Sequence, residues 1–121
     1  MPVQKILIVD DSPSDRQYLL EKLSAHGFEC VIAEDGNDGI AKAKAELPDL
    51  ILMDVIMPGT NGYEATRALT RDERTRSIPV FICTGKGQET DRLWGLRQGA
   101  KDYVTKPIDH RALIDKIAAL G

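Results

Sequence analysis

Cysteine, aromatic residues and long hydrophobic runs are scarce in this chain of 121 residues. Cys30 and Cys83 are its two cysteines, each lies inside an apolar run, and no Cys-x-x-Cys pair or Cys/His cluster accompanies them. This usage argues against a zinc site or a disulfide framework and predicts two small buried hydrophobic residues. No apolar run approaches the roughly 18 residues of a membrane span, and the first one is too short for a signal-peptide core. We therefore expect a cytoplasmic protein without membrane insertion.

An excess of one charge is also missing. The 16 lysines and arginines and the 19 aspartates and glutamates give a net charge of −3, and no block of like charge runs along the chain. A basic patch or stripe is the usual mark of a nucleic-acid binder, so direct contact with DNA or RNA is not expected. The hydrophobic fraction of 42% and the length are typical of one folded domain, here spanning residues 1–121.

Five short apolar runs alternate with five amphipathic stretches along the chain. Their β-branched residues and flanking turn residues favour strands, at residues 5–9, 29–33, 50–53, 80–83 and 103–105. The amphipathic stretches favour helices, at about residues 13–26, 36–46, 62–71, 88–98 and 109–120. This alternation predicts an α/β fold, a doubly wound five-stranded parallel sheet with helices on both faces. In the flavodoxin-like (βα)5 arrangement the strand order is 2-1-3-4-5, which separates the two cysteines.

The helical stretches carry specific start signals and apolar stripes. Ser12 directly before Pro13 is typical of a helix start, an N-cap residue followed by a proline at the first helical position. In the second stretch Leu47 continues the apolar face, and in the fourth Leu93 belongs to the core stripe. With Leu93 on the core side of this helix, the neighbouring Trp94, the single tryptophan, is expected to be partly exposed. It would then either contact a partner or pack locally.

Chemically reactive residues follow four of the five predicted strands. Since the carboxyl ends of parallel strands share one edge of a sheet, and ligands bind at that edge, we expect these residues to converge. They are Asp10 and Asp11 after the first strand, Asp54 after the third, Thr84 after the fourth, and Lys106 after the fifth. The sequence thus places three carboxylates, one hydroxyl and one ammonium in a single pocket.

The chemistry of this set favours phosphoryl transfer. Three carboxylates in one pocket repel one another unless they share a cation, and Mg²⁺ suits oxygen ligands of this kind. A carboxylate can also act as a nucleophile and form an aspartyl phosphate, whose charge a lysine, a hydroxyl and Mg²⁺ would neutralise. Taken singly, the members have structural explanations: Asp10 and Asp11 could cap the first helix, and Lys106 could be a surface lysine beside a turn.

The segments around these residues resemble the receiver domains of bacterial two-component response regulators over essentially the whole chain. The matching segments are ILIVDDS, LILMDVIMPGTNG, ICTGK and GAKDYVTKP. A longer segment is further similar to the small, chemotaxis-like regulators of type IV pilus twitching motility, and it reads ETDRLWGLRQGAKDYVTKPID.

The resemblance implies a role for each reactive residue. Asp54 would accept a phosphoryl group from a phosphohistidine on a sensor histidine kinase. Asp10 and Asp11 would hold Mg²⁺ together with Asp54 and the backbone carbonyl of Ile56, and Lys106 would pair with the phosphoryl oxygens. Such a domain is a phosphoacceptor that assists its own phosphorylation and dephosphorylation, and is not an enzyme in the ordinary sense.

The resemblance also implies a switch. Thr84 would move its hydroxyl toward the new phosphate and Tyr103 would follow it inward, reshaping the face made by the fourth helix, fifth strand and fifth helix, which a downstream protein reads. The Lys106–Pro107 peptide bond would be cis, a form that essentially only proline permits. Ile56 and Lys86 would flank the route of water to the phosphate and tune its lifetime.

Several alternatives stay open at this stage. The domain would be a monomer, with dimerisation on activation a further possibility, and its output would be a protein contact or the draining of phosphate from a shared kinase. A third hypothesis is that the output lies in an effector domain that would follow Gly121 in a longer protein. A haloacid-dehalogenase-like phosphatase would show an Asp-x-Asp at the first strand, and a nucleotide or flavin binder would show a glycine-rich phosphate loop, and neither motif is present. A degenerate receiver that only binds partners would lack part of the reactive set.

Overall fold

A computed structural model describes residues 2–85 and 89–120 of the chain. The strands are β1 (Lys5–Val9), β2 (Glu29–Ala33), β3 (Leu50–Asp54), β4 (Val80–Thr84) and β5 (Asp102–Thr105). The helices are α1 (Pro13–Ala25), α2 (Gly36–Glu46), α3 (Gly62–Arg71), α4 (Glu89–Arg97) and α5 (His110–Ala118). Strand and helix alternate as predicted, and Gln88, the predicted first residue of the fourth helix, lies outside the described residues.

The five strands form one parallel sheet in the order β2-β1-β3-β4-β5, which confirms the predicted fold. The strand boundaries differ slightly from the prediction: β3 and β4 each continue by one polar residue, Asp54 and Thr84, and β5 begins one residue earlier, at Asp102. These two residues therefore belong to the ladder itself, where Asp54 pairs with Cys83 and Thr84 pairs with Thr105. The sheet hydrogen bonds hold the reactive ends of the strands in a fixed register.

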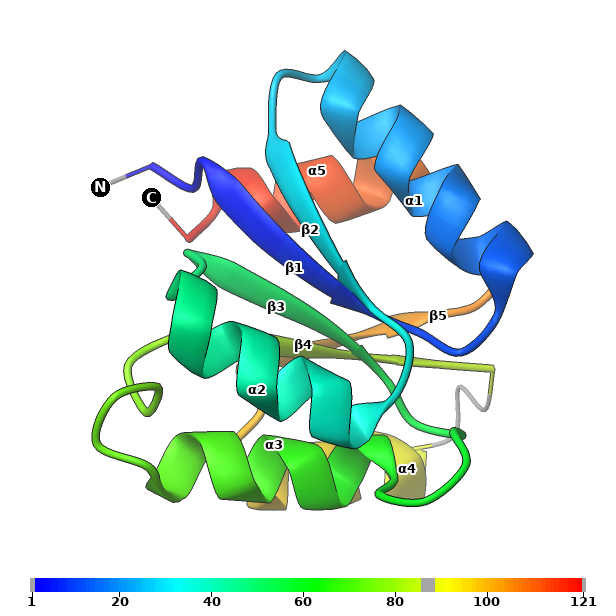
Figure 1. Ribbon diagram of the computed structural model, residues 1–121. Helices are drawn as coiled ribbons and strands as arrows, with labels where there is room; N and C mark the ends of the chain where they lie inside the picture. Colours follow the sequence, from blue (N-terminus) through cyan, green and yellow to red (C-terminus); the bar gives the residue numbers. More distant parts are fainter. Residues whose placement is uncertain (1, 86–88, 121) are drawn as a thin grey trace.

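Helices cover both faces of the sheet, with α1 and α5 on one side and α2, α3 and α4 on the other (Figure 1). Successive residues of a strand point to opposite faces, so that Ile6 and Ile8 of β1 pack with α1 and α5 while Leu7 and Val9 pack toward α2 and α3. The two apolar clusters fill the space between the layers. This double coverage explains why the central strands are almost continuously hydrophobic.

The helices begin at the carboxyl edge of the sheet, and α1, α2, α3 and α5 each follow a polar capping residue. Ser12 caps α1 and accepts a hydrogen bond from the backbone N–H of Asp15 at 3.3 Å, with Pro13 in the first turn, as predicted. Asn61 caps α3 and completes a capping box with Glu64. Caps of this kind satisfy backbone N–H groups that have no partner within the helix. They also direct the first turns of the helices toward the strand ends.

Two predictions about apolar stripes are wrong. Leu47 lies just beyond α2 in the left-handed conformation (φ 46°) and its residue is 56% exposed, because the helix ends at Glu46 and the chain turns outward there. Leu93 is also exposed, since Gly95 and not Leu93 faces β4. A Cβ at Gly95 would lie 3.3 Å from a side-chain carbon of Ile82, so a close approach of helix to sheet sets the rotation of α4.

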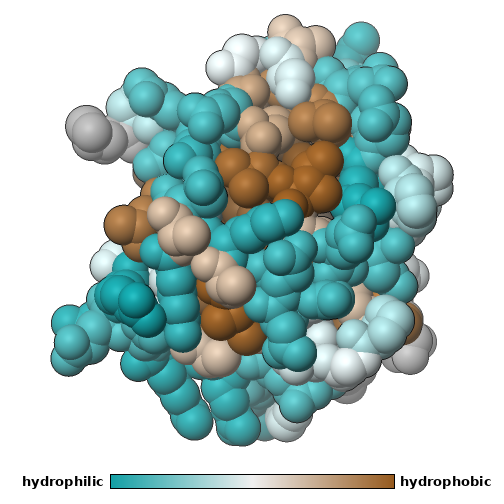
Figure 2. Space-filling view, in the orientation of Figure 1, coloured by the Kyte–Doolittle hydropathy of each residue, from teal (hydrophilic) through white to brown (hydrophobic). Residues whose placement is uncertain are grey.

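The remaining predictions for single side chains agree with the structure, except that Cys30 is only partly buried because it lies on the edge strand β2. Trp94 is half exposed and packs edge-on against Tyr63 of α3, with ring centroids 6.4 Å apart. The two cysteines are free and lie on β2 and β4, which are not neighbouring strands. Figure 2 shows a mainly hydrophilic surface, with hydrophobic groups visible around the edge strand β2, whose middle residues are only partly buried. Among the described helices, none has the length and apolar character needed to cross a bilayer.

Candidate functional site

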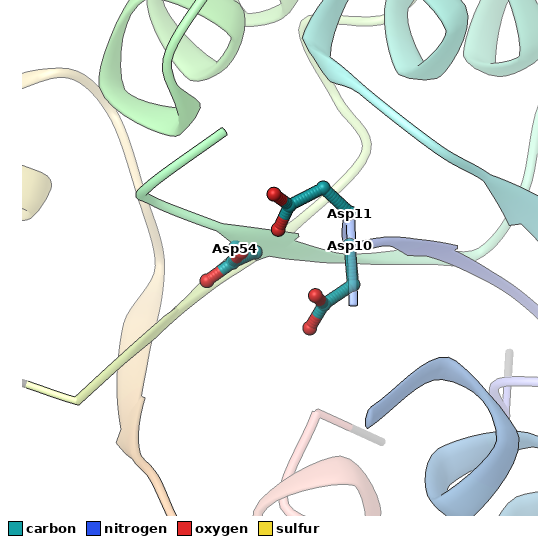
Figure 3. A group of neighbouring side chains, drawn as sticks. All are labelled: Asp10, Asp11 and Asp54. Carbon is teal, nitrogen blue, oxygen red and sulfur yellow. The ribbon is translucent and has the colours of Figure 1, made fainter. Parts of the chain in front are cut away.

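Three aspartates meet at the carboxyl edge of the central strands. Asp10 and Asp11 follow β1, Asp54 ends β3, and Figure 3 shows their carboxylates turned into a common space. One carboxylate oxygen from each lies within 4.8 Å of the others. Asp10 and Asp54 are buried, with 2% and 7% of each residue exposed, whereas Asp11 is open to solvent. The cluster therefore has a closed inner side and an open outer side.

Local hydrogen bonds fix the inner side of this cluster. The carboxylate of Asp10 accepts the backbone N–H of Ser12 at 2.9 Å, and the Arg16 guanidinium donates to the Asp10 carbonyl at 2.8 Å. On the other side, Gly62 lets the start of α3 lie directly against the end of β3. A Cβ at Gly62 would collide with the backbone carbonyl of Asp54, so only glycine fits there without a shift of the helix.

The Lys106 ammonium lies among the carboxylates as their counter-charge. Its Nζ is 2.8 Å from Asp10 Oδ2, 2.9 Å from Asp15 Oδ2 and 3.2 Å from Asp54 Oδ1. The loop that carries Lys106 follows β5, and the Lys106–Pro107 peptide bond is cis, as predicted. The backbone N–H of Lys106 donates to the carbonyl of Thr84 at 2.8 Å, which ties the loop to the end of β4.

These contacts shift the pKa values of the two central groups. Burial raises the pKa of Asp54 to about 6, with a further rise from the nearby Asp10 and an opposing effect of Lys106. Burial by itself would lower the pKa of Lys106, but its hydrogen bonds to Asp10 and Asp15 outweigh burial, so that this pKa is raised above the ordinary value. The lysine is thus held as a cation beside a carboxylate that lacks full compensation.

The other residues singled out from the sequence lie around this centre. Thr84 is buried at the end of β4. Tyr103 is half buried on β5, in register with Ile82, and packs against the core cluster on the α2–α3 side. Ile56 is two residues beyond Asp54 and 66% exposed, so its side chain reaches solvent. Lys86 lies outside the described residues.

The residues present fit a hard divalent cation such as Mg²⁺. Carboxylate oxygens are the ligands that Mg²⁺ prefers, and a few protein oxygens suffice because the ion keeps several waters. Asp10, Asp11 and Asp54 offer three such groups with an open side toward solvent. One lysine cannot neutralise all of them, which leaves negative charge that a cation would balance. The role of the Ile56 carbonyl as a further ligand stays a prediction.

Asp15 and Arg16 are members of the site that the sequence did not reveal. Both lie in the first turn of α1, and both reach the site from there, Asp15 to Lys106 and Arg16 to the Asp10 carbonyl. In the sequence, only their spacing of four to six residues from Asp10 and Asp11 could have indicated this. A helix that starts at the sheet edge keeps its first residues near that edge. The rotation of α1 about its axis decides which of them arrive.

The chain belongs to the response regulator receiver domain family, whose pattern it matches over residues 6–118. It is 53% identical to protein PilH of Pseudomonas aeruginosa over 116 residues, which are 96% of each chain. It is also 43% identical to the phosphate regulon transcriptional regulatory protein PhoB of the same organism, where it spans 50% of that longer protein. The resemblance inferred from the motifs is thereby confirmed.

Solved structures agree with this assignment. The chemotaxis protein CheY4 of Vibrio cholerae superposes with a TM-score of 0.92 at 29% identity, covering 98% of this chain and 99% of that one. The receiver domain of the sensor histidine kinase PA1611 of P. aeruginosa gives a TM-score of 0.87 at 30% identity, covering 95% and 94%. That structure holds a magnesium ion in its active-site cleft. Receiver domains as a family bind Mg²⁺ at an acidic pocket and are phosphorylated by sensor histidine kinases.

Proposed function

We propose that this domain is a phosphorylation switch in which Asp54 accepts a phosphoryl group from a sensor histidine kinase. One observation supports this most directly: Asp54 ends a buried central strand and lies 3.2 Å from the Lys106 ammonium, beside two further carboxylates. A carboxylate in such a place is a poor structural element, because burying it lowers stability unless it is fully compensated. The same carboxylate is a suitable nucleophile when a cation held by the acidic cluster offsets the charge of the incoming phosphoryl group.

The transfer itself is a displacement at phosphorus. A carboxylate oxygen of Asp54 attacks the phosphorus of a phosphohistidine, a P–O bond forms, and the P–N bond breaks. The electron pair of that bond stays on the imidazole nitrogen of the kinase, which then takes a proton from solvent. Lys106 donates a hydrogen bond to an equatorial phosphoryl oxygen as charge develops there. Thr84 would donate its hydroxyl to another of these oxygens.

Asp10, Asp11 and Asp54 would hold Mg²⁺, with the carbonyl of Ile56 as a further ligand. When bound, the ion supplies positive charge that neutralises the phosphoryl oxygens during transfer. The domain is then a phosphoacceptor that assists its own phosphorylation and dephosphorylation and has no separate substrate to turn over. Ile56 is exposed two residues beyond Asp54, and we expect its bulk to slow the approach of the water that removes the phosphoryl group.

The output would be a protein contact on the face of α4, β5 and α5. Tyr103 is half buried on β5, so an inward movement after Thr84 would change the outline of this face. The exposed side chain of Leu93 adds apolar area to α4, whereas Trp94 lies toward α3, beside Tyr63. The 53% identity to PilH along 96% of both chains supports a role in pilus-based twitching motility, either as a switch or as a phosphate sink for a shared kinase.

Intact-protein mass spectrometry after incubation with Mg²⁺ and acetyl phosphate tests the proposal. The wild type should gain the mass of one phosphoryl group in a Mg²⁺-dependent way, and Asp54→Asn should gain none. Asp38→Asn, which changes an acidic residue in the first turn of α2, is the matched control and should behave as wild type. A gain that persists in Asp54→Asn, or a wild type that binds Mg²⁺ and gains nothing from acetyl phosphate or a phosphorylated kinase, would contradict it.

A further inference from the structure

The Lys106 ammonium has three N–H donors, and three carboxylates surround it. Asp10 and Asp54 are two of these acceptors, and both also belong to the acidic cluster that suits Mg²⁺. Asp15 is the third, with its Oδ2 at 2.9 Å from Nζ, and it is not part of that cluster. A cation in the cluster would draw on the oxygens of Asp10 and Asp54. Asp15 is therefore the partner that Lys106 does not have to share.

Packing does not hold the Lys106 side chain in place by itself. One side of it lines a cavity of about 330 Å³ together with Asp15, Tyr18 and Leu19 of α1 and the residues that follow in its own loop. Long lysine chains have considerable rotamer freedom, so contacts at the ammonium decide where it points. On this side of the ammonium, the contact is the carboxylate of Asp15.

Asp15 is in turn fixed by the start of α1. It is the third helical residue, and its backbone N–H is capped by the Ser12 hydroxyl. The same helix makes a second contact with the loop that carries Lys106: the Tyr18 hydroxyl donates a hydrogen bond to the carbonyl of Ile108 at 2.9 Å. The first two turns of α1 thus contact the loop at both its side chain and its backbone.

We infer that Asp15 is a positioning residue for phosphoryl transfer, which holds the Lys106 ammonium so that its third N–H points to the oxygens on Asp54. This inference rests on the proposed function of Asp54 and adds to it a residue that touches neither the cation cluster nor the phosphoryl group. Once the phosphoryl group arrives, Lys106 exchanges the Asp54 oxygen for a phosphoryl oxygen and keeps its bond to Asp15. The negative charge of Asp15 is what this role requires.

The expected effect is modest because the Asp15 side chain is about half exposed. Ion pairs at such positions correspond to a change of about two- to fivefold in an equilibrium or rate constant. Asp15→Asn should therefore slow phosphorylation by acetyl phosphate about two- to fivefold, since the amide lacks the charge that holds the ammonium. Asp15→Glu keeps the charge on a longer chain and should restore most of the rate.

Three comparisons separate positioning from a general effect on α1. Asp38→Asn removes the equivalent acidic residue from the first turn of α2, where it pairs with Lys42 at 3.2 Å, and should leave the rate unchanged. In a Lys106→Met background, where phosphorylation is followed over a longer incubation, adding Asp15→Asn should not slow the rate further, because Asp15 acts through the lysine. In the metal-free protein, the ¹⁵N NMR signal of the Lys106 ammonium should broaden in Asp15→Asn and be retained in Asp15→Glu.

Two results would overturn the inference while leaving the function of Asp54 intact. One is a wild-type rate together with an unchanged ammonium signal in Asp15→Asn. The other is a loss of rate in Asp15→Asn that Asp15→Glu does not restore and that persists in full beside Lys106→Met. A wild type that takes up no phosphoryl group from any donor would instead remove the proposed function itself, and this inference with it.

Discussion

The middle of the central strands and their carboxyl ends are buried to a similar degree but are built from opposite kinds of side chain. Fully buried Ile8, Leu52 and Ile82 fill the middle of β1, β3 and β4. Two residues further along the chain from each of these, Asp10, Asp54 and Thr84 are buried instead. The backbone ladders of β3 with β4 and of β4 with β5 reach Asp54 and Thr84, so the two regions of these strands share their pairing and differ in their side chains.

The two regions contribute to stability in opposite directions. A buried leucine or isoleucine stabilises the fold by about 1.5–3 kcal/mol. A buried carboxylate is unfavourable unless hydrogen bonds and an opposite charge compensate it, and the raised pKa of Asp54 shows that compensation there is incomplete. The interior therefore supports an edge that is locally unfavourable in the absence of a bound cation. Uncompensated negative charge is also what attracts such a cation, so the same feature that weakens the edge makes it useful.

Leu52→Ala is the substitution that should affect the interior most. Leu52 is 1% exposed and packs between the sheet and the α1–α5 layer. Its truncation should lower the free energy of unfolding by about 3 kcal/mol, because the lost apolar contacts leave a cavity. Urea unfolding followed by circular dichroism measures this loss. Leu93→Ala makes the same chemical change at an exposed position of α4 and should shift stability by less than about 0.5 kcal/mol.

Equal losses for the two leucine variants would show that β3 does not lie in a packed interior. Below its unfolding transition, Leu52→Ala should still gain a phosphoryl group from acetyl phosphate with Mg²⁺. That result would separate the apolar support of the fold from the polar chemistry at its edge.

Lys106→Met should have the next largest effect, and at the polar edge. Removing the ammonium leaves Asp10 and Asp54 buried without their counter-charge, so the free energy of unfolding should fall by about 2 kcal/mol in the absence of Mg²⁺. Urea unfolding in the absence of Mg²⁺ measures this change in the free energy of unfolding. Lys116→Met is the matched control. It breaks a 2.9 Å ion pair with Asp102 whose two side chains are 39% and 33% exposed, and it should lower the free energy of unfolding by at most about 0.5 kcal/mol. Similar losses in both variants would contradict the view that burial distinguishes the site.

Much of this comparison could be predicted from the sequence, for a physical reason. A parallel strand that is buried on both faces is recognisable as a short apolar run, and the residue that ends the run lies at a known edge of the sheet. Asp10, Asp54 and Lys106 meet for that reason, and the strand order follows from the usual winding of such units. The end of a run is less certain than its centre, so Asp54 and Thr84 were expected after their strands and lie within them.

The contacts that were missed depend on how helices are rotated against the sheet. The sequence shows that Asp15 is in the first turn of a helix, but its contact with Lys106 depends on a loop 91 residues away. Leu93 faces solvent because Gly95 allows α4 to approach Ile82 closely, and this fit involves two elements at once. Leu47 was assigned to a helix that ends one residue earlier. Periodicity within one segment does not contain such information.

Chemical labelling of the two cysteines should disturb the fold least, and it shows where the solvent-accessible polar ends of the strands give way to the apolar interior. Cys83 is buried on β4, one residue before Thr84, and burial raises the pKa of its thiol to about 12. Cys30 lies on the edge strand β2 and is partly exposed, and burial raises the pKa of its thiol as well. The thiolate is the reactive form, so between pH 7 and pH 9 the labelling rate of Cys30 should rise about tenfold per pH unit. Cys83 should react only as fast as the chain opens. A Cys30→Ala variant isolates Cys83, and its rapid labelling under native conditions would show that solvent reaches past the polar edge into the interior.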